Sequence, residues 1–402
     1  MKVLVVGGGA GGLATAIHLR LAGHEVGLVE RNPEGVTYGW GILSPESLDP
    51  TYGTDPGTAE AIAEASHGHR GAVVQHPTGR REWMENEGHT IERHRLLEVL
   101  TARARALGAT VEFGREVDVR EIEDDTEHDL IVVSNGVNSP YRAAHTAEFG
   151  TETRNGENYY VWLGTTKMFR SFTFIAVRSE AGWLGCHAYG YDPDRSTVIV
   201  ECPVETWRNL GLGELGAREG LKVLEDLFRD ALDGHPLMLQ QRDLDLDKVP
   251  WLRYLQVRNE HWHRGKVVLV GDAAHTTHFS IGSGTRLAYG DAHALVEELG
   301  RHDDLNAALD EYESRRRADI RLAQRDAEYS ARFLENVDRY ARYDVDRFAS
   351  LFHWRQSPYL AKLPVRPYHR LRKTIENNPR AYRALRRTTA FRRGFYVRRH
   401  TH

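Results

Sequence analysis

The stretch Val3-Leu4-Val5-Val6-Gly7-Gly8-Gly9-Ala10-Gly11-Gly12 decides the fold of this chain. Four apolar residues followed by glycine are typical of a short strand that is buried on both faces of a parallel sheet. Gly7 permits a tight turn, Gly9 lets the backbone approach a pyrophosphate, and Gly12 lets the following helix pack closely on the sheet. The stretch therefore predicts a Rossmann-like α/β domain that binds a dinucleotide.

The residues after this turn support the same prediction. Apolar positions at helical spacing predict a helix over residues 11–22, and residues 25–30 are expected to form the second strand. Glu30 ends that strand about 20 residues after the turn, where its carboxylate can accept hydrogen bonds from an adenosine ribose. An acid at this place disfavours a ribose 2′-phosphate, so the pattern favours FAD or NAD over NADP.

The composition bounds the kind of protein. The chain has 402 residues, of which 27% are charged, and a mean hydropathy of −0.53. It has no long uncharged apolar run that could span a membrane, and Cys186 and Cys202 form neither a CxxC motif nor a ligand cluster. We therefore expect a soluble cytoplasmic protein with one large or two coupled globular domains, no disulfide scaffold, no metal site and no nucleic-acid partner.

Further elements of the nucleotide-binding domain recur along the chain, so this domain is predicted to be discontinuous. Residues 158–202 alternate aromatic, β-branched and small side chains, which indicates an inserted mixed β-sheet substrate domain, and long charged helices follow. We expect helices at 93–107 and 284–299 and strands at 110–116, 130–133 and 266–270. The expected boundaries are 1–75, 90–155 and 260–300 for the nucleotide-binding domain, 76–89 and 156–259 for the substrate domain, and 301–402 for a C-terminal helical segment with a basic tail.

A second motif separates FAD from NAD. The strand expected at 266–270 runs into Gly271-Asp272, and Gly282-Ser283-Gly284 opens the helix at 284–299. An acidic side chain can hold the hydroxyls of a sugar chain, and backbone N–H groups at a helix start stabilise the negative edge of a reduced flavin. Together with the N-terminal turn, this motif favours FAD, and the discontinuous domain is expected to be an FAD-binding domain.

Several strings give the chain a family resemblance. They are Tyr38-Gly39-Trp40-Gly41, Tyr160-Val161-Trp162-Leu163-Gly164-Thr165, His187-Ala188-Tyr189, residues 275–285 (HTTHFSIGSGT) and residues 335–342 (ENVDRYAR). With these strings the sequence resembles the single-component FAD-dependent aromatic hydroxylases, and among them the salicylyl-CoA 5-hydroxylases. It is also similar to the 2-aminobenzoyl-CoA monooxygenases and to the tryptophan-derivative hydroxylases of violacein biosynthesis. The resemblance covers roughly residues 1–355.

Three departures from the wider family concern the region beside the cofactor. Asn135-Gly136 stands where Asp-Gly is usual, His278-Phe279 stands where Pro-Pro is usual, and Arg286 stands where Asn is usual. These changes are expected to leave FAD binding intact and to reshape the cavity beside the flavin.

The resemblance implies an enzyme in which NADH or NADPH reduces bound FAD, O2 adds to the flavin to give a C4a-hydroperoxyflavin, and one oxygen atom passes to an aromatic ring. It implies an aromatic CoA thioester as substrate, with salicylyl-CoA hydroxylated to 2,5-dihydroxybenzoyl-CoA (gentisyl-CoA) as the leading case. An acyl carrier protein is an alternative carrier, and a tryptophan-derived substrate is an alternative ring. An FAD-dependent oxidase on the same scaffold, and a flavin-binding protein without turnover, are further alternatives.

The candidate site residues come from these motifs and from the resemblance. Arg93, at the start of the helix at 93–107, matches an arginine that the family places near the FAD pyrophosphate. For each substrate-cavity candidate a role in the core is an equal alternative, and no covalent nucleophile is expected. The cofactor-binding candidates are Gly7, Gly9, Gly11, Gly12, Glu30, Arg31, Arg93, Asp272, Gly282 and Gly284, and the substrate-cavity candidates are Trp162, His187, Tyr189, His278 and Phe279.

The C-terminal segment is strongly basic. Glu376 is its one acidic residue among many arginines and lysines in residues 355–402, although the whole chain has a net charge of −4. Such a segment is typical either of a solvated tail that lies against an acidic body or of a site that binds phosphates or an acidic partner. In the second case, the candidates for binding the phosphates of a CoA handle are Arg366, Arg370, Arg372 and Lys373.

Overall fold

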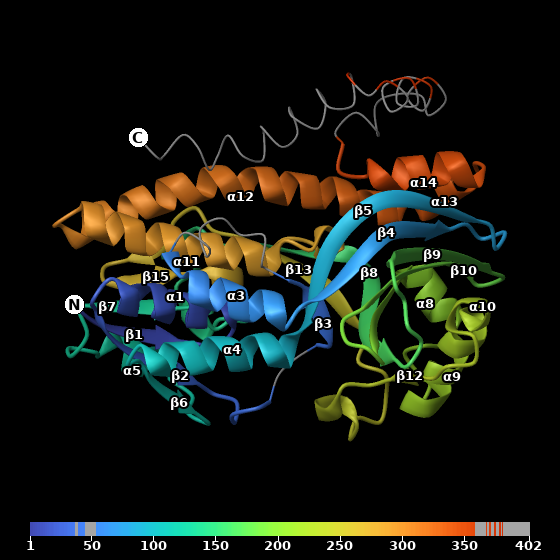
Figure 1. Ribbon diagram of the computed structural model, residues 1–402. Coiled ribbons are helices and arrows are strands. Elements are labelled where there is room, and N and C mark those ends of the chain that lie inside the picture. Colours follow the sequence, from blue (N-terminus) through green and yellow to red (C-terminus); the bar gives the residue numbers. More distant parts are fainter. Residues whose placement is uncertain are drawn as a thin grey trace.

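Two sheets organise the computed structural model, which describes residues 1–36, 39–44 and 54–357 and the separate positions 367, 370, 374, 378 and 380. One sheet has six strands and the other has nine. Figure 1 shows them at opposite ends of the molecule, with the long helix α12 (Leu305–Glu335) running past both. The predicted fold class is confirmed: an α/β protein with a Rossmann-like domain, an inserted mixed β-sheet and a helical segment after them.

The six-stranded sheet forms from the apolar runs that the sequence marks as buried. Its strand order is β14 (His263–Arg264), β15 (Val267–Leu269), β7 (Leu130–Val133), β1 (Lys2–Val6), β2 (Glu25–Glu30) and β6 (Thr110–Phe113). All neighbours are parallel except β14 and β15. β6 ends before residue 116 because Gly114, with φ of 77°, adopts the left-handed conformation and turns the chain away.

Helices pack beside this sheet and complete its core. α1 (Ala10–Leu21) contacts α4 (Arg93–Ala106) and α11 (Gly284–Arg301), and α3 (Pro56–Glu64) contacts α4. Leu13, Ala16 and Leu19 of α1 have no exposed surface, as their helical spacing predicts. Shorter helices lie nearby: α5 (Val119–Glu123), α6 (Pro140–Ala144) and α7 (Thr146–Phe149).

The nine-stranded sheet is mixed, because β4 and β9 are parallel whereas its other pairs are antiparallel. It takes in residues 41–43 and 67–75 as well as later strands, so its limits do not coincide with the expected domain boundaries, which stay a prediction. Along its main path the order is β12 (Leu237–Met238), β8 (Glu152–Thr165), β11 (Ser196–Pro203), β10 (Gly182–Gly190), β9 (Phe172–Ser179), β4 (His67–Gln75), β5 (Arg81–Glu92) and β3 (Gly41–Leu43), and β13 (Leu252–Arg258) also pairs with β8.

Each face of this sheet is covered by helices. On one face α8 (Val204–Asn209), α9 (Ala217–Leu227) and α10 (Arg229–Leu232) lie by an apolar cluster that includes Val200 and Leu224. On the other face the end of α12, with α13 (Val337–Ala341) and α14 (Val345–His353), packs on Phe174 and its neighbours. Three short 3₁₀ helices complete the described structure: η1 (Gln241–Asp243), η2 (Gly271–Ala273) and η3 (Phe279–Ile281).

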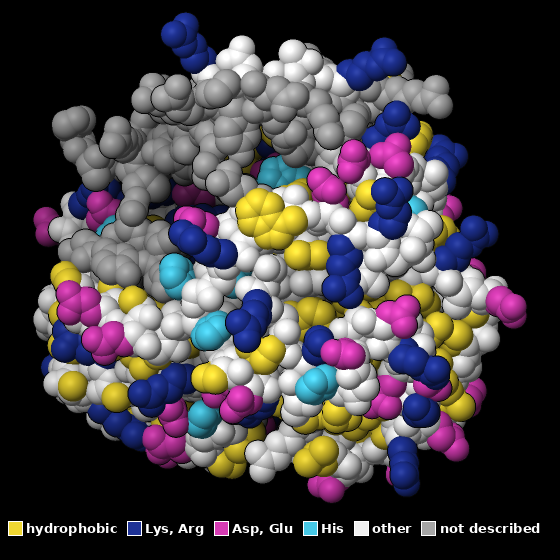
Figure 2. Space-filling model, turned by 45° about the vertical axis from the view of Figure 1, so that its right-hand side comes forward, with side chains coloured by type: hydrophobic (Ala, Val, Ile, Leu, Met, Phe, Trp, Pro, Cys, Tyr) yellow, Lys and Arg dark blue, Asp and Glu magenta, His cyan; other side chains and the backbone are white. Residues whose placement is uncertain are grey.

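The described surface carries charges of both signs. Figure 2 shows acidic and basic side chains interspersed over one side of the molecule. Among the described helices, none is long and apolar enough to cross a membrane. The phosphate-binding candidates Arg366, Arg372 and Lys373 lie outside the described residues, as does Tyr38, and Arg370 is one of the separately described positions.

Candidate active site

The glycine turn between β1 and α1 has the geometry that its pattern predicts. A Cβ added to Gly7 would lie 2.6 Å from the Ser134 carbonyl oxygen, and one added to Gly12 would lie 2.0 Å from the Gly7 carbonyl oxygen. Gly9 differs, because no described atom lies within 4 Å of where its Cβ would be. Gly7 and Gly12 thus permit close packing, whereas Gly9 leaves open space in front of the start of α1, where N–H groups and the helix dipole favour an anion.

Glu30 fastens this turn to the end of β2. Its Oε2 accepts a hydrogen bond from the backbone N–H of Gly8 at 2.7 Å, and its Oε1 accepts from the backbone and side-chain nitrogens of Asn32 at 2.9 and 2.6 Å. A carboxylate has about four acceptor positions, so capacity remains for a ribose hydroxyl. The ribose contact stays a prediction, and the structure adds a role in positioning the turn.

A cavity of about 980 Å³ opens beside the turn. Gly7, Gly9, Glu30, Arg31 and Arg93 all border it, so the structure brings together half of the cofactor-binding candidates there. Further basic side chains also border the cavity, each paired with a carboxylate of the protein. These further residues are Arg95, Arg103, Arg105 and Arg115.

Gly11 and Gly12 do not border this cavity. A Cβ on Gly11 would lie 3.1 Å from the Ala288 side chain of α11, so Gly11 permits close packing between α1 and α11. Asp272, Gly282 and Gly284 form a separate group around η2 and the start of α11. Gly282 adopts φ of 58°, and a Cβ there would lie 2.2 Å from Leu43.

Asp272 is the acidic residue of the second group. Its side chain has exposed surface although protein surrounds it, a combination expected of a side chain that borders an internal hollow. Burial raises the pKa of the Asp272 carboxyl, and the charges of Arg93 and Arg142 oppose the rise. Arg142 also fixes this loop, because its guanidinium donates to the Ala273 carbonyl oxygen at 3.1 Å.

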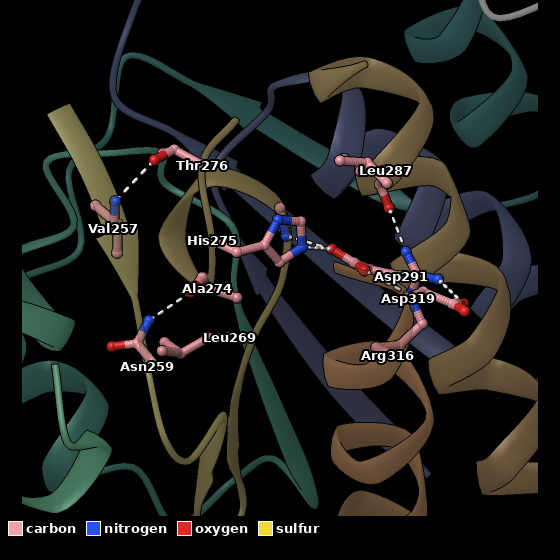
Figure 3. Close-up of polar contacts among 12 residues, drawn as sticks. Val257, Asn259, Leu269, Ala274, His275, Thr276, Leu287, Asp291, Arg316 and Asp319 are labelled. Carbon is pink, nitrogen blue, oxygen red and sulfur yellow. Dashed lines mark hydrogen bonds and ion pairs between the residues drawn. The ribbon is translucent and has the colours of Figure 1, made fainter. Parts of the chain in front are cut away.

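A buried ionic network holds the loop that carries Asp272 (Figure 3). Asp291 of α11 accepts from the Gly271 backbone N–H at 2.9 Å, pairs with His275 Nε2 at 2.7 Å, and accepts from Arg316 Nε of α12 at 2.8 Å. Burial alone would raise the pKa of Asp291, but His275 and Arg316 outweigh it and the pKa is lowered. Arg316 in turn donates to the Leu287 carbonyl oxygen and to Asp319. The loop geometry is therefore set from two helices.

The substrate-cavity candidates of the nine-stranded sheet share one side of it. Trp162 of β8 pairs in register with Ile199 of β11, and Ile199 pairs with His187 of β10. The Phe172 ring lies 6.0 Å from the His187 ring and 5.7 Å from the Tyr189 ring, so both point to the same side, as the period of two predicts. We call this side the substrate face; it also presents Tyr160 and Glu201, which are paired in register.

The remaining two candidates lie against the substrate face. Phe279 of η3 has its ring centre 4.7 Å from that of Tyr160 and 6.2 Å from that of His187. His278 has its Nε2 atom 3.9 Å from Glu201 Oε1. Phe279 therefore meets His187 where η3 approaches the substrate face, and Trp162 and Tyr189 lie elsewhere on the same face.

Two of these residues also have roles in the core. Tyr189 donates its hydroxyl to the Gly41 carbonyl oxygen at 3.0 Å, and the Trp162 ring packs where a Cβ of Gly39 would lie at 2.5 Å. His187 is buried with neither ring nitrogen bonded to a described residue, and burial lowers its pKa well below the ordinary value. The Trp162 and Tyr189 contacts agree with the alternative role in the core, and their contact with a substrate stays a prediction.

The sequence motifs missed several residues that shape these sites. Asp291 and Arg316 lie in helices where acidic and basic residues are common, so spacing alone does not distinguish them. Glu201 had a signal, since it is an acid that follows the apolar run Thr197-Val198-Ile199-Val200 in a strand of buried residues. Tyr160 comes next to that acid through strand register, and Arg355 comes next to His278 only through tertiary packing.

The comparison with protein families decides the class. Residues 1–327 match the model described as the FAD binding domain. The chain belongs to this family. The site of this protein fits FAD. Its glycine turn opens on a cavity that is large enough for a nucleotide and is bordered by several arginines.

Relatives of this FAD-binding protein narrow the class further. It is 37% identical to salicyloyl-CoA 5-hydroxylase of Streptomyces sp over 91% of this chain and 72% of that protein. It is 34% identical to 3-hydroxy-4-methyl-anthranilyl-[aryl-carrier protein] 5-monooxygenase of Streptosporangium sibiricum over 82% of this chain and 88% of that protein. A solved structure of a 2-methyl-3-hydroxypyridine-5-carboxylic acid oxygenase variant shares the fold, with a TM-score of 0.68, 21% identity and coverage of 90% of this chain and 94% of that chain.

These findings confirm the enzyme class and the cofactor. The protein is an FAD-dependent aromatic monooxygenase that takes reducing equivalents from NADH or NADPH. They favour this class over an oxidase or a flavin-binding protein without turnover.

Proposed function

We propose that this monooxygenase hydroxylates an aromatic acyl thioester, salicylyl-CoA, at C5 to give 2,5-dihydroxybenzoyl-CoA. The relative of 37% identity is named for this reaction. C5 lies para to the ring hydroxyl, where a phenolate is electron-rich and reacts with an electrophilic oxygen. The expectation that the substrate is a thioester, and not a free acid, comes from the strings around Trp162, His187 and His278.

The observation that carries the proposal is the aromatic wall between η3 and the substrate face. Phe279 and Tyr160 approach each other there, His187 lies beside them, and Trp162 lies on the same face. A planar aromatic acyl group matches such a wall, because aromatic rings gain by stacking and by edge contacts. The same side chains exclude water from the reacting ring.

The residues that would hold FAD come from both groups of the site. Gly7 and Gly9, with Arg93, would bind the pyrophosphate, Glu30 the adenosine ribose, and Asp272 the ribityl chain, while Gly12 keeps α1 close to the sheet. The start of α11 at Gly284 would face the flavin ring with its N–H groups. When bound, FAD supplies the redox chemistry that activates O2 for transfer to the ring.

Turnover with matched substrates tests this function. The FAD-loaded protein is mixed with NADH or NADPH and with salicylyl-CoA, salicylate or benzoyl-CoA, and both reductant loss and product are measured. We expect hydroxylated product from salicylyl-CoA and little from the free acid. Equal turnover of salicylate would reject the thioester, and loss of NADH or NADPH without product would reject hydroxylation of that ring.

A carrier-protein-bound aromatic acid is the second candidate substrate. The relative of 34% identity is named for an aryl-carrier-protein substrate, and the basic C-terminal segment has the charge to attract an acidic carrier. The same acyl group is presented on CoA and on an aryl carrier protein over a series of salt concentrations. A KM for the carrier form that is lower than for CoA and rises with salt would favour this candidate.

A further inference from the structure

A buried chain of hydrogen bonds fixes the proton of His278. The backbone N–H of Ser280 donates to His278 Nδ1 at 3.3 Å, so Nδ1 acts as an acceptor. The Ser280 hydroxyl lies 2.8 Å from the same nitrogen and 2.7 Å from the Ser330 hydroxyl, which accepts from Arg355 Nε at 2.9 Å. Because a guanidinium group only donates, protons run from Arg355 through both serines to Nδ1. His278 therefore carries its own proton on Nε2.

This Nε2–H points toward a buried acid. Glu201 Oε1 lies 3.9 Å from His278 Nε2, too far for a direct hydrogen bond, and accepts from Asn158 Nδ2 at 2.9 Å. Glu201 is only 4% exposed, and its Oε2 has no hydrogen-bond partner among the described residues. An oxygen atom beside the gap can reach both groups at about 2.8 Å. Such an oxygen would accept from His278 and donate to Glu201, which is the pattern of a hydroxyl group.

The protonation states of the pair suit proton exchange. Burial raises the pKa of Glu201 to about 8, and burial lowers the pKa of His278 to about 3. His278 thus stays a neutral donor at neutral pH, whereas Glu201 is mostly protonated at pH 7 and becomes the proton-accepting carboxylate as the pH rises through about 8. The other titratable or charged groups that face the pair are Tyr160 of β8, His187 of β10, Glu335 of α12, Tyr254 of β13 and Arg355 after α14.

We propose that His278 and Glu201 bind the ring hydroxyl of the substrate and that the Glu201 carboxylate takes up its proton. This inference rests on the proposed function and names the recognition element of the same site. The phenolic O–H bond breaks, the proton joins the carboxylate, and the electron pair stays on the phenolate oxygen, so no redox partner is needed. The phenolate then accepts from His278 Nε2–H and from the new carboxyl O–H.

The raised proton affinity of Glu201 makes this transfer more favourable. An ordinary phenol such as that of tyrosine has a pKa of about 10, and an ordinary glutamate has one of about 4.3. The mismatch therefore falls from about six pKa units to about two for Glu201. A ring activated as its phenolate directs the incoming oxygen to the para carbon.

Ligand pairs that differ only in the hydroxyl test the pair of residues. The FAD-loaded protein is titrated with salicylyl-CoA and benzoyl-CoA, with salicylate and benzoate, and with phenol and anisole, following the flavin absorbance. We expect the hydroxyl-bearing member to bind at least tenfold tighter in the unmodified protein. Glu201→Gln keeps the shape and the Asn158 contact but cannot take up the phenol proton, and should reduce that preference below threefold. Glu205→Gln, on the exposed start of α8, should leave it unchanged.

A second measurement needs no variant. The phenol of bound salicylyl-CoA or salicylate should ionise at least one pH unit below the free ligand, seen in its phenolate absorbance. No hydroxyl preference in any ligand pair, an unchanged preference in Glu201→Gln, or an unshifted phenol ionisation would each overturn the proposal. Failure to bind or hydroxylate any CoA thioester, together with a retained preference for salicylate over benzoate, would reject the proposed function and leave the hydroxyl site standing.

Discussion

The nucleotide turn, residues 7–12, and the substrate face differ in whether their polar groups have hydrogen-bond partners. In the turn region, backbone groups have partners: the Gly7 N–H donates to Val29, the Gly8 N–H to Glu30, and the Ser134 hydroxyl to Val6. On the substrate face, several buried polar atoms have none among the described residues. These are Trp162 Nε1, both ring nitrogens of His187, and Glu201 Oε2.

This difference separates a region built for rigidity from one built for a ligand. A buried polar atom without a hydrogen-bond partner destabilises the fold by about 1–3 kcal/mol. A polar ligand that bonds to such atoms on the substrate face would offset this penalty. The demands of the turn at Gly7 and Gly12 are steric. Variants in the first region should therefore lower stability, and variants in the second should change ligand binding or pH response.

The largest effect is expected from the network behind the cofactor loop. Arg316→Met leaves the Asp291 carboxylate buried without its guanidinium partner, and should lower the free energy of unfolding by about 3–5 kcal/mol. Urea denaturation measures the change. Arg325→Met, at an exposed position of the same helix, is the matched control and should change stability little. Equal losses in both variants would show that the network does not stabilise the loop.

The next effect tests the steric demand of the turn. Gly12→Ala places a Cβ 2.0 Å from the Gly7 carbonyl oxygen, and should cost about 3 kcal/mol and abolish FAD retention. Gly9→Ala meets open space, so its stability should stay within about 0.5 kcal/mol of the unmodified protein. Denaturant unfolding and the flavin-to-protein absorbance ratio measure both. A stable, yellow Gly12→Ala protein would contradict the packing argument.

A smaller effect addresses the cofactor contact between the two regions. Asp272→Ala removes a charged acceptor whose hydrogen bonds are each worth about 1.5–3 kcal/mol, and should weaken FAD binding by roughly 10- to 100-fold. Apoprotein titrated with FAD, followed by flavin fluorescence, measures this. Asp245→Ala, at an exposed position, should leave the dissociation constant unchanged. Unchanged affinity in Asp272→Ala would remove this residue from the cofactor site.

The smallest effect is expected for His187 on the substrate face and concerns how stability depends on pH. Burial lowers the pKa of His187 in the folded protein, so the unfolded chain binds the proton more readily. Its contribution to stability is present above about pH 6.5 and is lost as pH falls below that value. This loss is absent in His187→Phe. Between pH 6 and 5 the free energy of unfolding of the variant should therefore decrease less steeply than that of the unmodified protein, by up to about 1.4 kcal/mol per pH unit.

Unfolding curves at pH 5–8 provide the measurement for this variant. An identical slope in His187→Phe would mean that His187 is protonated inside the fold.

The features that could be predicted from the sequence are those that depend on interactions between residues close together in the chain. The turn at Gly7 and Gly12, the helix after it and the buried strands depend on neighbours in sequence, and were predicted closely. The match of Trp162 to His187 across β11 depends on strand register, which local patterns do not specify. Arg316, 25 residues from its partner Asp291, is placed by helix packing and had no local signal.

The insertion of one sheet within the other has a consequence for synthesis. β7 has all four side chains buried in the finished sheet, yet its neighbour β15 lies about 130 residues later in the chain. At about 5–20 residues per second on the ribosome, the nascent chain leaves that apolar edge unpaired for roughly 7 to 26 s. The nine-stranded sheet is completed in the meantime, so the nascent Rossmann-like domain must wait for a later segment while the inserted one matures.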